Sequence, residues 1–339
     1  MQDLAPFEAS IRAALAAEGL DPRGHFWRLR PAAGGVQLEA TEASFARRGQ
    51  EALRQQFPGS RVEVVLLPAP ELQAQRAWVK ASVAEVRAEP KHEAAQTTQA
   101  LQGEVLEPLL HEEGWLLARL PDGYLGWVRD WHLRWTDAAV PSAFAARTDA
   151  RIASPLVRLR ETPGPGAAPV AESPLGTAVV RRQERDDWVE IELPGGAVGW
   201  VRRQALRPGS GLWETAAPSL LDMLQGFLGV PYLWGGKSPK GFDCSGLVQF
   251  AFALHGVPLP RDSDQQFGCG VPVQQFTAGD LLFFGRERIG HVGVALDAHR
   301  FIHARGEVRR DSLAPDSPLH APELAAILRG GRRLLPPPR

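Results

Sequence analysis

The sequence predicts a C-terminal α+β domain that follows two small β-barrels and a short N-terminal α/β segment. An internal repeat in the middle of the chain indicates the barrels. After a Gly-Ser-Gly segment at 209–211, the sequence pattern changes, and predicted helices precede predicted strands. We therefore expect four parts, with boundaries at 1–76, 77–140, 150–208 and 212–339.

The composition argues against several classes of protein. Of the 339 residues, 44% are hydrophobic and 23% are charged, as in ordinary globular domains. The formal net charge of −1 provides no field that would attract nucleic acid or an anionic membrane surface, so we expect neither as a partner. The two cysteines, Cys244 and Cys269, are too few for a disulfide framework and form no metal-binding CxxC.

The N-terminal residues differ from those of a secretory signal peptide. Asp3 and Glu8 stand where such a peptide carries basic residues, and no uninterrupted apolar core follows them. No segment approaches the roughly eighteen apolar residues that a membrane-spanning helix needs. We expect a cytoplasmic protein. Unconventional export, or a misassigned start codon that hides a signal for the cell wall, is the alternative.

The N-terminal segment is expected to form a small α/β unit. Its patterns predict a helix over 7–20, a strand over 36–41, a helix over 43–57 and a strand over 61–68. A Pro-Gly turn separates the second helix from the second strand. Nothing in this segment indicates chemistry.

The repeat unit ends in a strand that contains Gly-Trp-Val. ARLPDGYLGWVRDWHLR at 118–134 recurs as IELPGGAVGWVRRQALR at 191–207, and each copy follows a strand of alternating polarity. Short strands with frequent turn signals predict two small β-barrels. We expect Trp127 and Trp200 to lie in the barrel cores.

Cys244 is the candidate nucleophile. We expect one helix over 219–230 and a second that begins at Cys244, with Asp243 as its N-cap. Cys244 then lies in the first turn, where unpaired backbone N–H groups and the helix dipole favour the thiolate. A lone cysteine is more commonly a small buried apolar residue, so the assignment requires a partner base.

His291 and His303 are the candidates for that base and for the group that orients it. They lie on predicted strands at 291–296 and 301–304, which follow a strand at 280–284. Zinc binding is the alternative for two histidines, but the chain has no HExxH and no third ligand at a short spacing. We therefore expect no metal and no cofactor.

The two histidines can meet only if they share a face of the sheet. In a hairpin, this requires a connecting loop with an odd number of residues, or a bulge. Alternation places Val292 toward the core and His291 with Gly293 on the opposite face. We expect the Cys244 helix to pack against the face that carries Gly293.

The C-terminal motifs resemble those of the NlpC-type family of cell-wall cysteine peptidases. The resemblance rests on YLWGGKSPKGFDCSG, PRDSDQQ, TAGDLLFF, HVGVAL and FIHA in this order, and it extends over about 212–339. The repeat units resemble bacterial SH3-like domains. The family resemblance implies a papain-like fold and hydrolysis of the bond between γ-D-glutamate and a diamino acid in peptidoglycan stem peptides.

The resemblance also implies the catalytic roles. Cys244 attacks the carbonyl, His291 transfers the proton, and His303 orients His291. The Cys244 backbone N–H and the Tyr232 hydroxyl are the expected oxyanion donors. A core aromatic ring is the alternative reading of Tyr232.

The chain from 77 onward is similar to recycling enzymes that require a free N-terminal L-Ala on the stem peptide. This similarity implies that Asp262 binds the terminal ammonium group, and that Ser245 and Ser263 bind the D-Glu carboxylate. Tyr124 of the first repeat, where the second has Ala197, lines the site. Further substrate-binding candidates are Asp243, Arg261, which could instead be a surface residue, and Glu89, for which Glu93 is an alternative.

Three other functions are compatible with these residues. The first is hydrolysis of intact cell wall, with the SH3-like domains as wall-binding modules. The second is a thiol-dependent amidase or acyltransferase reaction, because papain-like folds support several such reactions. The third is a binding protein without activity, which the complete set of Cys244, His291 and His303 disfavours.

Overall fold

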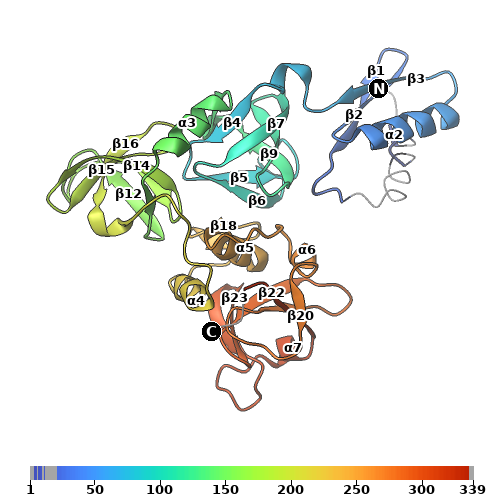
Figure 1. Ribbon diagram of the computed structural model, residues 1–339. Coiled ribbons are helices and arrows are strands. Elements are labelled where there is room, and N and C mark those ends of the chain that lie inside the picture. The colour runs from blue at the N-terminus through green and yellow to red at the C-terminus, as the bar shows by residue number, and fades with distance from the viewer. Residues whose placement is uncertain (1–3, 6, 10, 12–20, 336–339) are drawn as a thin grey trace.

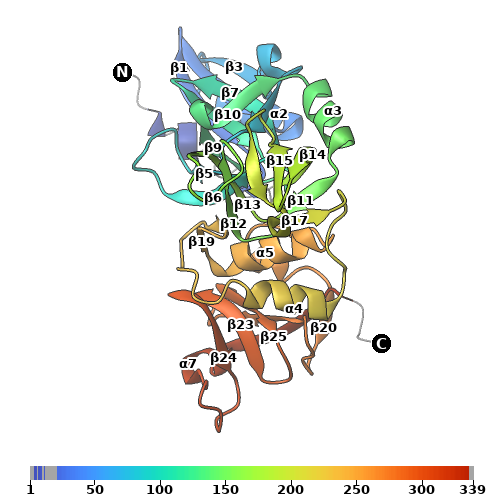
Figure 2. The same ribbon diagram turned by 90° about the vertical axis from the view of Figure 1, so that its left-hand side faces the viewer.

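The computed structural model describes residues 4, 5, 7–9, 11 and 21–335. The N-terminal domain lies beside the first barrel, and the second barrel lies on the other side of the first (Figure 1). In both views, helix α5 (Cys244–Leu254) lies between the barrels and the C-terminal sheet (Figures 1 and 2). The helix predicted over 7–20 falls largely outside the described residues.

The N-terminal domain is a three-stranded sheet with one described long helix. Its strands β1 (Trp27–Ala32), β2 (Gly35–Ala40) and β3 (Arg61–Leu66) are adjacent in this order, and β2 pairs with β3 in parallel. Helix α2 (Ala43–Gln56) connects the parallel pair and buries Phe45 and Leu53 against the sheet. The predicted strands and second helix are confirmed. The sequence WRLRPA of β1 has no clean alternation, so this strand was missed.

The two barrels have the same topology, strand for strand. In the first, the order is β10-β4-β7-β8-β9-β5-β6, and in the second it is β17-β11-β14-β15-β16-β12-β13. The first comprises β4 (Arg76–Val79), β5 (Val83–Arg87), β6 (Gln96–Leu101), β7 (Val105–Glu112), β8 (Trp115–Arg119), β9 (Leu125–Arg129) and β10 (Leu133–Thr136). The second comprises β11 (Ala150–Ile152), β12 (Leu156–Arg160), β13 (Pro169–Pro174), β14 (Ala178–Arg185), β15 (Trp188–Glu192), β16 (Val198–Arg202) and β17 (Leu206–Pro208), and helix α3 (Ala139–Arg147) joins the barrels.

The repeated tryptophans lie outside the barrel cores, contrary to our expectation. Val128 belongs to the core cluster of the first barrel, while Trp127 packs with the linker residues Leu67 and Leu72. Trp127 also meets Phe26 of the N-terminal domain edge-on, at 6.3 Å between ring centroids. Because neighbouring residues of a strand point to opposite faces, the inward valine leaves the tryptophan outside, where it binds the neighbouring domain.

The C-terminal domain is an antiparallel sheet covered by helices. The six strands have the order β20-β25-β21-β22-β23-β24, so the predicted α+β arrangement is confirmed. The strands are β20 (Val271–Val273), β21 (Leu281–Phe284), β22 (His291–Ala295), β23 (Arg300–Arg305), β24 (Glu307–Ser312) and β25 (Leu328–Arg333). Around them lie α4 (Ala217–Gln225), α5, α6 (Ser263–Gln266), α7 (Pro322–Ala325) and the short hairpin of β18 (Lys237–Ser238) and β19 (Gly241–Phe242).

Helix α5 packs on the face of β22 that the sequence analysis did not choose. Val292 and Val294 share one cluster with the apolar residues of α5, so the expected packing against the Gly293 face is wrong. A Cβ at Gly293 would lie 2.9 Å from Cδ2 of Phe301 and 3.2 Å from Cβ of His303. The glycine therefore makes room for neighbouring strand β23 rather than for the helix.

The barrels contact opposite ends of α5. From the first barrel, Gln99 Oε1 accepts a hydrogen bond from the Lys237 N–H at 2.8 Å, close to the helix start. From the second barrel, Gly176 with φ +88° approaches Leu254 at the helix end, where a Cβ added to this glycine would lie 2.4 Å from Cδ2 of the leucine.

Among the described residues, no helix combines the length and apolarity that crossing a bilayer requires.

We predict that Phe252→Ala destabilises the C-terminal domain. Phe252 is fully buried on α5, so its truncation should leave a cavity and lower the free energy of unfolding by about 3–5 kcal/mol. Urea unfolding followed by circular dichroism measures this change. Val271→Ala is the control, because Val271 is 66% exposed and should shift stability by about 0.5 kcal/mol or less. Equal effects of the two substitutions would contradict this account of the core.

Candidate active site

Cys244 lies at the first position of α5, as predicted, and Asp243 caps the helix. The Asp243 carboxylate accepts hydrogen bonds from the Gly246 N–H at 2.6 Å and the Gly235 N–H at 2.9 Å. A Cβ at Gly246 would lie 2.0 Å from the Gly236 carbonyl oxygen. The first helical turn and the preceding loop therefore fit together only with glycine at this position, and this close contact fixes the position of the thiol.

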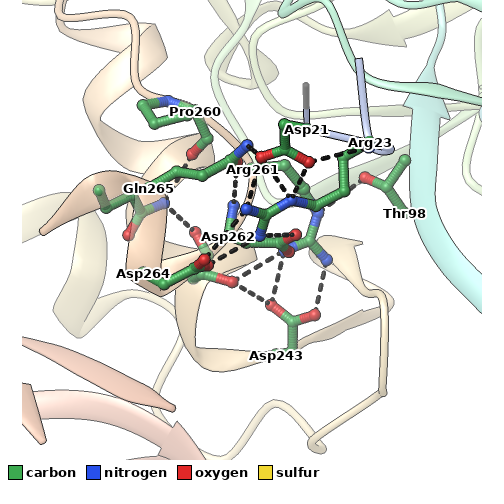
Figure 3. Close-up of polar contacts among 11 residues, drawn as sticks. Asp21, Arg23, Thr98, Asp243, Pro260, Arg261, Asp262, Asp264 and Gln265 are labelled. Carbon is green, nitrogen blue, oxygen red and sulfur yellow. Dashed lines mark hydrogen bonds and ion pairs between the residues drawn. The ribbon is translucent and has the colours of Figure 1, made fainter. Parts of the chain in front are cut away.

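Arg261 is a buried residue that holds this cap, so its alternative reading as a surface residue is wrong. It is 1% exposed and donates to both Asp243 carboxylate oxygens, at 3.0 and 2.6 Å (Figure 3). It also donates to Ser245 Oγ at 2.9 Å and to Thr98 Oγ1 of the first barrel at 2.7 Å. Asp243, Ser245 and Arg261 thus bond to one another. A direct contact of any of them with substrate stays a prediction.

His291, His303 and Asp311 form a linear relay. His291 Nε2 lies 2.7 Å from His303 Nδ1, and His303 Nε2 lies 3.1 Å from Asp311 Oδ2. In the β22–β23 hairpin Val294 pairs with Ile302, which places the histidines on one face across a loop with an odd number of residues. The parity condition is therefore met.

Asp311 is the member of this relay that the sequence analysis missed. Its strand β24 has the sequence EVRRDS, which lacks the alternating apolar residues that signal a strand. Burial raises the pKa of Asp311, but the hydrogen bonds and charges of His303 and Arg309 outweigh this and hold the pKa below its ordinary value. The carboxylate is therefore ionised and acts only as an acceptor.

The ionised Asp311 determines which nitrogen of each histidine carries a proton. His303 must donate from Nε2, so its Nδ1 accepts the proton of His291 Nε2. The Nδ1 atom of His291 is then left with a free lone pair. His291 is thereby prepared as a general base, with its ring held by a fully buried neighbour.

Burial holds Cys244 and His291 in their neutral forms. It raises the pKa of the Cys244 thiol to about 11, with a further contribution from Asp243, although the backbone N–H groups of Val292 and Ser245 act in the opposite direction. Burial lowers the pKa of His291 to about 3, and a proton added to His303 would act in the same direction. The position of Cys244 at the helix start had suggested a resting thiolate, but the effect of burial outweighs that of the helix dipole. The thiol therefore depends on a base.

Tyr232 lies beside the thiol. Burial raises the pKa of its hydroxyl to about 12, and negative charge on Cys244 or Asp243 adds to this effect. The hydroxyl is consequently protonated at neutral pH and can donate a hydrogen bond. Tyr232 is fixed by its backbone N–H, which donates to the Gly306 carbonyl at 2.8 Å.

Asp262, Ser263 and Tyr124 come together next to this centre. Asp262 and Ser263 begin α6, which is tied to α5 because Gln266 Nε2 donates to the Ser245 carbonyl at 3.1 Å. Burial raises the pKa of Tyr124 well above its ordinary value, and the adjacent charge of Asp262 adds to it. The first barrel therefore supplies a tyrosine to this region.

Arg23 of the N-terminal domain reaches the same region and was not predicted. Its Nη1 atom donates to Asp262 Oδ2 at 3.0 Å. Nothing in the surrounding DPRG sequence distinguishes this arginine from a surface residue. Glu89, by contrast, lies in an exposed turn and pairs with Lys91 at 2.7 Å, and Glu93 is exposed in the same turn.

A cavity of about 500 Å³ lies away from these residues, where both barrels meet the C-terminal half of α5. It is mainly apolar, with Trp78, Leu175 and Phe250 in its walls. Since neither Cys244 nor the relay residues line it, we assign the chemistry to the group of side chains described above and not to the cavity.

Within 21–335 and the few described residues before them, His, Cys, Asp and Glu side chains form no group of three that could hold a metal ion.

Comparison with protein families places known domains on three segments. Residues 229–322 match the NlpC/P60 family, residues 86–133 match the bacterial dipeptidyl-peptidase SH3 domain, and residues 153–208 match a bacterial SH3 domain.

Curated relatives share part of their length with this chain. A γ-D-glutamyl-L-lysine dipeptidyl-peptidase of Bacillus cereus is 34% identical over 155 residues, which cover 43% of this chain and 46% of the relative. Dipeptidyl-peptidase 6 of Lysinibacillus sphaericus is 35% identical over 153 residues, covering 42% of this chain and 54% of the relative. The chain thus spans about half the length of these relatives in the aligned regions.

Solved structures share the fold over a longer stretch. A NlpC/P60 family protein from Bacillus cereus has a TM-score of 0.65 at 23% identity, covering 77% of this chain and 100% of the other. A NlpC/P60 endopeptidase from Photobacterium damselae has a TM-score of 0.53 at 15% identity, covering 78% of this chain and 72% of the other. With the family matches, these likenesses show that the chain carries an NlpC/P60 domain preceded by two bacterial SH3 domains.

Proposed function

We propose that this protein is a cysteine peptidase that hydrolyses the bond between γ-D-glutamate and a diamino acid in peptidoglycan stem peptides with a free N-terminal L-Ala. The observation that carries the proposal is the relay of Asp311, His303 and His291, next to which the backbone N–H of Val292 contacts the Cys244 thiol at a helix start. The names of the two curated relatives support a γ-D-glutamyl substrate.

The residues suggest a two-step mechanism. His291 Nδ1 takes the thiol proton as Cys244 Sγ attacks the γ-carbonyl carbon, and the Cys244 N–H and Tyr232 hydroxyl donate to the oxyanion. The tetrahedral intermediate expels the amine of the diamino acid, which receives the proton from His291. Water then attacks the thioester and gives a proton to His291, which returns it to the thiol as the acid leaves.

Selectivity for a free amino terminus would come from Asp262. Its carboxylate already accepts a hydrogen bond from a cationic group, Arg23, so an ammonium ion matches its chemistry. Ser263 is the candidate for the D-Glu carboxylate, and Tyr124 would form a wall against longer substrates.

Hydrolysis of intact wall is the second candidate, with the barrels as wall-binding modules. One observation disfavours it for the first barrel. Thr98 bonds to Arg261, and Gln99 bonds to the Lys237 N–H in the loop before the Cys244 helix, so this barrel is attached directly to the supports of that helix. A barrel that is part of the catalytic unit is better suited to shaping a site than to searching a polymer.

The proposal predicts discrimination between two synthetic peptides. Wild-type protein should cleave L-Ala-γ-D-Glu-meso-diaminopimelate, and the N-acetylated peptide should lose at least about thirtyfold in kcat/KM, because Asp262 would lose its charged partner. Liquid chromatography of the products measures both rates. Equal cleavage would reject the requirement for a free amino group, and cleavage by the Cys244→Ala variant would reject the mechanism.

We predict that Asp311→Asn lowers kcat by about 10²-fold or more with little change in KM. The amide can donate to His303 Nε2 and so favour the wrong tautomer throughout the relay. Steady-state kinetics on the free-amino peptide test this prediction. Asp316→Asn is the matched control, because Asp316 is exposed on a nearby turn. Wild-type kcat in Asp311→Asn would exclude the relay from catalysis.

The reactivity of Cys244 should depend on His291. In His291→Ala, alkylation of Cys244 by iodoacetamide should be slow at pH 7 and rise about tenfold per pH unit, because burial raises the pKa of the thiol to about 11. The wild-type protein should react faster at neutral pH, since His291 accepts the proton. Mass spectrometry in a Cys269→Ser background follows the single remaining thiol. Equal rates at pH 7 would contradict the role of His291 as the base.

A further inference from the structure

Arg23 binds the carboxylates of Asp21, Asp262 and Asp264, as Figure 3 shows. It donates from Nε and Nη2 to Asp21, at 2.8 and 2.6 Å. It donates from Nη1 and Nη2 to Asp264, at 2.8 and 3.0 Å, and from Nη1 to Asp262 at 3.0 Å. These contacts use all five N–H groups of the guanidinium, so it has none left for a substrate carboxylate.

The backbone around Arg23 is attached to the first barrel. The Leu125 N–H donates to the Arg23 carbonyl at 2.8 Å, and Arg119 Nη1 donates to the Gly24 carbonyl at 3.0 Å. Leu125 follows Tyr124, the tyrosine that lies next to Asp262. The N-terminal segment thus runs along the wall of the proposed substrate site and inserts one side chain into it.

This contact is open to exchange. The side chains of Arg23 and Asp262 are 28% and 30% exposed, and that of Asp264 is 47% exposed. Ion pairs that remain in contact with water are individually weak. A competing cation can therefore displace the guanidinium without unfolding either domain.

We propose that Arg23 is an intramolecular occupant of the ammonium-binding position at Asp262, through which the N-terminal domain restrains its own enzyme. The inference rests on the proposed function, because it assigns Asp262 to the terminal ammonium group of the stem peptide. The Arg23 guanidinium bonds to Oδ2 of Asp262 and places a positive charge against this carboxylate, so the ammonium group of the substrate binds there only when Arg23 has left. The apparent affinity is then reduced in proportion to the time that Arg23 occupies the position.

Binding to the inactive Cys244→Ala protein tests this competition. The ligand is L-Ala-γ-D-Glu-meso-diaminopimelate, and isothermal titration calorimetry gives its Kd. Arg23→Ala should tighten binding about threefold to tenfold, because the competitor is gone. Arg23→Lys, which keeps the charge but loses the forked contacts to two carboxylates, should give an intermediate value.

Asp264→Asn separates competition from a general charge effect. Asp264 holds Arg23 through two hydrogen bonds, so its loss should release the arginine and tighten binding about threefold. An account based on charge alone makes the opposite prediction, because this substitution removes a negative charge near a cationic ligand. Tighter binding in both Arg23→Ala and Asp264→Asn supports the proposal, and weaker binding in either overturns it.

Two controls distinguish this inference from the proposed function. Arg47→Ala removes a cation from the exposed face of α2 in the same domain and should leave Kd unchanged. The N-acetylated peptide should bind weakly to every variant. If the protein binds the free-amino peptide more tightly than the N-acetylated one, and Arg23→Ala leaves this preference unchanged, the inference is overturned and the proposed function is not. No preference in any variant overturns the proposed function and the inference with it.

Discussion

The buried ion pair between Arg261 and Asp243 is the interaction on which the rest of the site depends. Two charges of opposite sign are stable at this depth only because nearly all of their hydrogen-bonding groups have partners. The pair joins the cap of the Cys244 helix to Thr98 of the first barrel. The position of the thiol is therefore tied to a separate domain, which explains how a barrel can contribute to the proposed peptidase site.

Burial has a second consequence for the chemistry. The environment that makes the site rigid also disfavours charge on Cys244 and His291. The proposed transfer of one proton from Cys244 to His291 creates two opposite charges close together, which is less costly than either charge alone. In the proposed mechanism, the relay through His303 to the ionised Asp311 stabilises the imidazolium formed in this transfer.

The duplicated barrels show how one fold acquires different roles through its contacts. Both have the same strand order, yet the first supports the start of α5 and the second supports its end. Tyr124 is present in the first barrel and Ala197 stands at the corresponding place in the second. The outward-facing Trp127 then attaches the N-terminal domain to the first barrel, which brings Arg23 close to Asp262.

The sequence alone determined the four-part organisation, the repeat, and the helix start at Cys244, because these depend on local periodicity, capping and glycine placement. It also identified His291 and His303, although strand parity permitted their pairing without requiring it. Only the tertiary structure decided the contacts between residues distant in the chain. Asp311 lies on a polar strand without a periodic signal, Arg261 is charged yet fully buried, and Arg23 reaches the site from a domain that carries no motif. Their positions depend on packing between domains, which local sequence patterns do not encode.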